Sequence, residues 1–114
     1  MKRILIIDEN VEILQLFQYF LSSEDLKSVD FFDSPKKAIK YIGMNKYKTI
    51  ITDYYFSNEK IGAKNILKKA AENNIENRII LTSTSKEIDL KECFATFLTR
   101  KPITKKKFLF LCKM

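Results

Sequence analysis

The segment TIITDYYF, residues 49–56, places an aspartate directly after a strand-like run. The run Thr49–Thr52 predicts a strand covered on both faces, and Asp53 follows it. An ionised carboxylate at the edge of an apolar sheet is costly unless nearby groups compensate its charge. We therefore expect the residues that follow the neighbouring strands to supply partners for Asp53.

Short apolar runs alternate with helical patterns along the chain. The predicted strands are Ile4–Ile7, Val29–Phe32, Thr49–Thr52, Ile79–Thr82 and Ala95–Leu98. The first predicted helix follows an N-cap at Asn10, and the second begins at Ser34-Pro35. The other three predicted helices cover Ala63–Ala70, Ile88–Phe94 and Thr104–Lys113. Strands that alternate with helices predict an α/β fold with a parallel sheet and right-handed crossovers.

The residue totals exclude several classes of protein. The length of 114 residues suits one domain, and 46% apolar with 31% charged residues is typical of a folded globular chain. The absence of histidine excludes histidine-based zinc sites, Ser-His-Asp triads and Cys-His dyads. Cys93 and Cys112 lack CxxC spacing, which favours reduced, buried thiols.

The net charge of +7 comes mostly from lysines spread along the chain. This spread favours solvent-exposed helix faces over a nucleic acid surface, and no zinc-finger spacing or basic-aromatic strand supports nucleic acid binding. The first apolar run is too short for a signal peptide, and no run reaches membrane-spanning length. We therefore expect a cytoplasmic protein without a membrane partner.

Chemically complementary residues lie at the carboxyl ends of four of the five predicted strands. Asp8 and Glu9 follow the first, Asp53 the third, Thr82 ends the fourth, and Lys101 comes after the fifth. Each has a simpler explanation taken alone, such as a turn, a helix cap, strand propensity or a solvated loop. In an open parallel sheet the strand ends share one edge, where three carboxylates would repel. A hard cation relieves that repulsion, and oxygen ligands favour Mg²⁺.

Four segments resemble, in order, the motif blocks of the receiver (CheY-like) domain of two-component response regulators. They are ILIIDEN (4–10), TIITDYYF (49–56), IILTSTS (79–85) and FLTRKPI (97–103). The resemblance implies a flavodoxin-like (βα)5 doubly wound sandwich whose five parallel strands lie in the order 2-1-3-4-5. It also implies one receiver-like domain over residues 1–114, here with no output domain. The segment between Thr82 and Lys101 is shorter than usual, so we expect the fourth helix to be short or irregular.

The resemblance also implies roles for the residues at the strand ends. Asp53 would be the phosphoacceptor, taking a phosphoryl group from a sensor histidine kinase or a phosphotransfer protein, while Thr82 and Lys101 bind phosphoryl oxygens. The implied Mg²⁺ ligands are Asp8, Glu9, Asp53 and the backbone carbonyl of Tyr55. Such a domain promotes its own phosphorylation and dephosphorylation, and signals to a downstream protein target by contact.

The chain departs from the family pattern in three places. Phe56-Ser57 stands where the family usually has Met-Pro, and the loop 57–61 is longer than usual. Leu98 occupies the position of the family's switch aromatic, and Phe97 lies one residue earlier. A bulge near Arg100 would bring Phe97 into the aromatic position, because one extra residue reverses the facing of a strand.

Other functions fit parts of the sequence. A receiver-like adapter or dimerisation module that is not phosphorylated is the main alternative, favoured by these departures. A haloacid-dehalogenase-like phosphatase would carry a second aspartate two residues after its nucleophile, where this chain has Tyr55. The FLFLC run at 108–112 predicts either a helix end buried in the domain or a contact surface. That surface would support a homodimer through the fourth helix, fifth strand and fifth helix.

Overall fold

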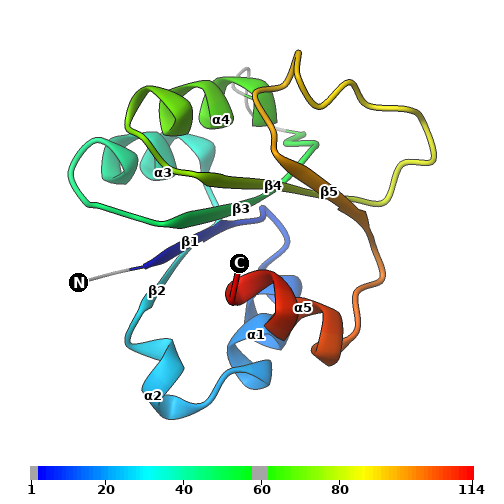
Figure 1. The fold of residues 1–114 in the computed structure, drawn as a ribbon. Coiled ribbons are helices and arrows are strands. Elements are labelled where there is room, and N and C mark those ends of the chain that lie inside the picture. The colour runs from blue at the N-terminus through cyan, green and yellow to red at the C-terminus, as the bar shows by residue number, and fades with distance from the viewer. Residues whose placement is uncertain (1–2, 58–61) are drawn as a thin grey trace.

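A five-stranded parallel sheet separates two layers of helices in the computed structural model, which describes residues 3–57 and 62–114 (Figure 1). The strands lie in the order β2-β1-β3-β4-β5, which confirms the predicted flavodoxin-like topology. Their bounds are β1 Ile4–Ile7, β2 Val29–Phe32, β3 Thr49–Asp53, β4 Asn77–Thr82 and β5 Phe97–Arg100.

The helices flank the sheet, with α3 and α4 on one face and α1 and α5 on the other (Figure 1). Their bounds are α1 Val11–Phe20, α2 Ser23–Leu26, α3 Pro35–Ile42, α4 Ala63–Glu72 and α5 Lys105–Cys112. The predicted N-cap at Asn10 is confirmed, since its side chain accepts a hydrogen bond from the backbone N–H of Glu12 at 2.9 Å. The short helix α2 was not predicted; the Ser22 hydroxyl caps it.

The prediction of a helix over Ile88–Phe94 is wrong, and the connection between β4 and β5 is irregular (Figure 1). One helical turn forms there, in which the backbone N–H of Cys93 donates to the carbonyl of Asp89 at 3.1 Å. Phe94 then adopts a left-handed conformation with φ of 60°, which stops the turn from continuing as a helix. The segment between β4 and β5, where we expected a short or irregular helix, is therefore irregular.

Each sheet face buries its own set of apolar side chains. Leu5, Ile7 and Ile50 pack under α3 and α4, and alternate residues of the same strands pack under α1 and α5. In the second layer the ring of Phe17 stacks on that of Phe108 at 4.4 Å between centroids. The predicted buried face of α4 is confirmed in full, by Ala63, Ile66, Leu67 and Ala70.

Strand β5 pairs with β4 without interruption from Ile79–Phe97 to Thr82–Arg100. The bulge proposed near Arg100 is therefore absent from this strand pair. Phe97 packs in the α1–α5 layer, while Leu98 packs in the α3–α4 layer. The predicted loop 57–61 lies, beyond Ser57, outside the described residues. Among the described helices, none has the length and apolar character needed to cross a bilayer.

Candidate functional site

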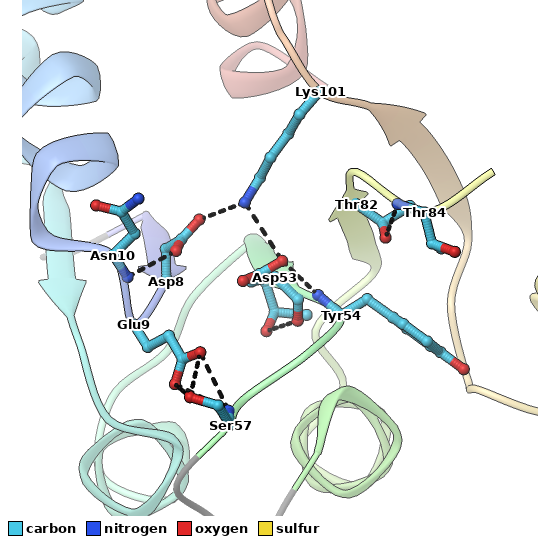
Figure 2. Close-up of polar contacts among 10 residues, drawn as sticks. Asp8, Glu9, Asn10, Asp53, Tyr54, Ser57, Thr82, Thr84 and Lys101 are labelled. Atoms are coloured by element: carbon cyan, nitrogen blue, oxygen red, sulfur yellow. Dashed lines mark hydrogen bonds and ion pairs between the residues drawn. The ribbon is translucent and has the colours of Figure 1, made fainter. Parts of the chain in front are cut away.

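The carboxyl ends of β1 and β3 bring two carboxylates to the same point of the sheet edge. Ile7 pairs with Thr52 in the parallel register, so Asp8 and Asp53 are the next residues of adjacent strands. Lys101, just beyond β5, reaches both: its Nζ lies 2.8 Å from Asp8 Oδ2 and 3.3 Å from Asp53 Oδ1 (Figure 2). Asp53 therefore faces a second carboxylate and an ammonium group shared by both, as we expected from the strand ends.

Asp8 is the most deeply buried charge of this cluster, with 2% of its surface exposed. Lys101 binds its Oδ2, and its Oδ1 accepts a hydrogen bond from the backbone N–H of Asn10 at 2.9 Å. Both oxygens thus have a hydrogen-bond partner, as buried polar groups require. The same turn leads into α1, so the fold holds Asp8 in one orientation.

Asp53 is less favourably placed for its negative charge. Burial and the nearby charge of Asp8 raise the pKa of Asp53, while Lys101 and the backbone N–H of Tyr54, at 2.9 Å, act in the opposite direction. A positive group that reaches the site would stabilise the ionised form of a carboxylate held near a like charge. Such perturbed carboxyl groups are characteristic of functional sites.

Glu9 lies beside this pair but points elsewhere. Its carboxylate accepts from the backbone N–H of Ser57, at 3.1 and 3.0 Å, and from the Ser57 hydroxyl, at 3.0 and 3.2 Å (Figure 2). Among residues 3–57 and 62–114 no three acidic, histidine or cysteine side chains are grouped closely enough to hold a metal. Sequence reasoning placed Glu9 with Asp8 and Asp53 and did not foresee Ser57 as its partner.

Thr82 is the last residue of β4 and follows Leu81, which pairs with Asp53 on β3. The Thr82 side chain is fully buried. Its Oγ1 accepts a hydrogen bond from the backbone N–H of Thr84 at 3.2 Å (Figure 2). The side chain of Tyr55, two residues beyond Asp53, is 57% exposed and contacts Tyr54 edge-on. Its backbone carbonyl remains a predicted ligand.

The donors at this edge fit Mg²⁺ by their chemistry. Mg²⁺ is commonly held by one or two carboxylates together with water and phosphate oxygens. Asp8 and Asp53 supply two such carboxylates within reach of one ammonium nitrogen. Glu9 could join them only by leaving Ser57.

Comparisons with known proteins indicate one domain family and one fold. The sequence model of the response regulator receiver domain family matches residues 4–108 of this chain. No curated protein matches the chain. Among solved structures, the signal receiver domain of an HD domain-containing protein from Pseudomonas fluorescens Pf-5 is 20% identical with a TM-score of 0.79, covering 98% of this chain and 91% of that one.

Two further solved structures are similar. A response regulator receiver domain protein from Clostridium thermocellum is 22% identical with a TM-score of 0.76, covering 99% of this chain and 92% of that one. The chemotaxis protein CheY4 of Vibrio cholerae is 18% identical with a TM-score of 0.76, covering 99% and 97%. Likeness at these identities establishes the shared fold.

Proposed function

The chain belongs to the response regulator receiver domain family, and on that premise we propose that Asp53 accepts a phosphoryl group. The donor would be a phosphohistidine of a sensor histidine kinase or a phosphotransfer protein. The observation that carries the proposal is the meeting of Asp8, Asp53 and Lys101 at one point of the sheet edge. The fixed ammonium group of Lys101 beside Asp53 suits a reaction that brings negative charge to the site, because it can pair with a phosphoryl oxygen.

In the proposed step an oxygen of Asp53 attacks phosphorus in line with the leaving nitrogen. A new O–P bond forms, the P–N bond breaks, and its electron pair remains on the imidazole nitrogen. Lys101 pairs with a phosphoryl oxygen while Asp8 keeps the ammonium group oriented. Mg²⁺ held by Asp8 and Asp53, with Glu9 and the Tyr55 carbonyl as further ligands, would neutralise charge on the phosphoryl oxygens.

Phosphorylation would change the hydrogen bonds of the β4 edge. An acyl phosphate adds negative charge and acceptor oxygens beside Thr82. We infer that the Thr82 hydroxyl then donates to a phosphoryl oxygen, which alters its contact with Thr84. The segment after β4 would carry this change to a downstream protein target. The domain itself is then the signalling unit, with no catalytic activity beyond its own phosphorylation and dephosphorylation.

Two observations favour a second candidate, an adapter that works without phosphorylation. Leu98 in place of the switch aromatic removes the ring that usually couples to the threonine, and Glu9 is bound by Ser57. Such an adapter would act through binding or dimerisation. The exposed ring of Phe110, 57% accessible with Lys107 over it at 5.5 Å, offers a contact on the α5 face. A change of solution mass in Phe110→Glu would support a homodimer there.

Intact mass spectrometry separates the two candidates. The protein is incubated with Mg²⁺ and a small acyl phosphate donor, and we expect one added phosphoryl group. Asp53→Asn should abolish the addition. Asp33→Asn is the matched control, because Asp33 is an exposed carboxylate that follows β2 at the same edge. No addition to the parent with any donor would favour the adapter, and equal addition to parent and Asp53→Asn would contradict Asp53 as acceptor.

A further inference from the structure

Ser57 stands at a position where receiver domains usually carry proline, and the difference has a structural consequence. Proline has no backbone N–H and no hydroxyl. Ser57 has both groups and uses both on Glu9, in contacts of 3.0 to 3.2 Å. Each carboxylate oxygen of Glu9 therefore accepts from the same residue. Hydrogen bonds to an ionised group are stronger than those between neutral groups.

These bonds fix the direction in which Glu9 points. Figure 2 shows its carboxylate against Ser57, while Asp8 and Asp53 face Lys101. Ser57 is 48 residues away in the chain and immediately precedes the segment 58–61. The contact thus joins the turn after β1 to the connection after β3.

We propose that Ser57 is a positioning residue that holds Glu9 out of the Mg²⁺ ligand set and so weakens cation binding at Asp8 and Asp53. The inference rests on the proposed magnesium site. A cation that recruits Glu9 must first break its bonds to Ser57. The apparent affinity is then the intrinsic affinity multiplied by the fraction of molecules in which Glu9 is free to ligate.

The test is Mg²⁺ binding measured by titration calorimetry without any phosphodonor. Ser57→Ala removes the hydroxyl, and we expect Mg²⁺ to bind roughly threefold more tightly, since a contact at the surface contributes less than a buried one. Ser57→Thr keeps both donors and should bind Mg²⁺ like the parent. Ser85→Ala is the matched control, because Ser85 is exposed in the connection after β4.

A second pair of variants shows whether Ser57 acts through Glu9. In a Glu9→Gln background, Ser57→Ala should leave the Mg²⁺ dissociation constant unchanged, because the carboxylate that the hydroxyl binds is gone. Unchanged or weaker binding in Ser57→Ala would overturn the inference while leaving the phosphorylation proposal standing. An equal gain with and without the Glu9 carboxylate would overturn it as well.

The failure of the two proposals can be told apart. If neither parent nor Ser57→Ala binds Mg²⁺, the magnesium site itself is wrong and this inference falls with it. Thermal unfolding adds an independent readout, in which added Mg²⁺ should raise the melting temperature more in Ser57→Ala than in the parent. A merely structural role for Ser57 would lower the melting temperature equally with and without Mg²⁺.

Discussion

Replacing Lys101 by methionine is expected to destabilise the cation-free protein. The substitution keeps a long, flexible side chain but removes the ammonium group that binds both Asp8 and Asp53. Asp8, 2% exposed, would then be a buried carboxylate whose remaining hydrogen-bond partner is the backbone N–H of Asn10. A second carboxylate would lie close to it without a compensating charge.

The size of the effect follows from the distances. At 2.8 Å the attraction between Lys101 and Asp8 is about 6 kcal/mol for an effective dielectric constant near 20, before desolvation is subtracted. Removing one partner of a buried ion pair costs about 3–5 kcal/mol in measured cases. The Lys101 and Asp53 side chains keep 18% and 16% exposure, so we expect a loss near the lower end, about 3 kcal/mol.

Urea unfolding followed by far-ultraviolet circular dichroism measures the difference, since the chain has no tryptophan to report it by fluorescence. Lys91→Met is the control, because Lys91 is exposed on the irregular connection before β5. Acidification through the raised pKa of Asp53 should shrink the difference between Lys101→Met and the parent, because the protonated acid no longer pairs with an ammonium group. A Lys101→Met protein within about 0.5 kcal/mol of the parent at neutral pH would refute the reasoning.

Three further outcomes are expected. Burial raises the pKa of Asp53 above its ordinary value of 3.8, so ionisation of Asp53 opposes folding. Relative to Asp53→Asn, the parent should therefore lose stability as the pH rises from 3.8 through the raised pKa. A difference between their urea midpoints that does not change with pH would contradict this. Phe108→Ala should cost about 3–5 kcal/mol in urea unfolding, because the ring is fully buried and stacked, whereas Phe110→Ala should cost less than about 1 kcal/mol; equal losses would be inconsistent with this packing. Burial raises the pKa of Cys112 to about 12 and also raises that of Cys93, so both thiols should react with iodoacetamide far more slowly in the folded protein than in urea, as peptide mass mapping would show.

The central strands β1 and β3 were predicted well because nearly all of their residues are buried. The bounds of Ile4–Ile7 agree with β1 residue for residue, since an uninterrupted apolar run flanked by polar residues marks such a strand. The bounds of Val29–Phe32 also agree with β2, although this run contains Asp30 and is only partly buried. Strand β5 begins two residues later than predicted. Thr96 exchanges hydrogen bonds with the backbone of Arg78 through its side chain, and regular pairing starts only at Phe97.

The connection between β4 and β5 could not be predicted in the same way. The pattern over 88–94 has apolar residues at helical spacing, but only one turn forms before Phe94 takes a left-handed conformation. Arg100 contributes from outside this segment, donating hydrogen bonds to the carbonyls of Thr84 and Lys86 at 3.1 Å. Tertiary contacts of this kind override weak local propensity.

The site was predictable where it depends on topology. Asp8, Asp53 and Lys101 meet because parallel strands end at one edge, which the order of strands and helices already implied. The orientation of Glu9 was not predictable, since it depends on a side-chain rotamer and on a partner from another loop. The one available signal was a serine in a position where the resemblance led us to expect proline.

The most direct test of the central claim locates the phosphoryl group on the chain. Borohydride reduces an acyl phosphate on aspartate to homoserine, which peptide mass spectrometry assigns to a position. After incubation with Mg²⁺ and an acyl phosphate donor, we predict homoserine at residue 53 and unmodified aspartate at residues 8 and 33. Reduction at residue 8 or 33 to the same extent, or no homoserine at residue 53, would contradict the account.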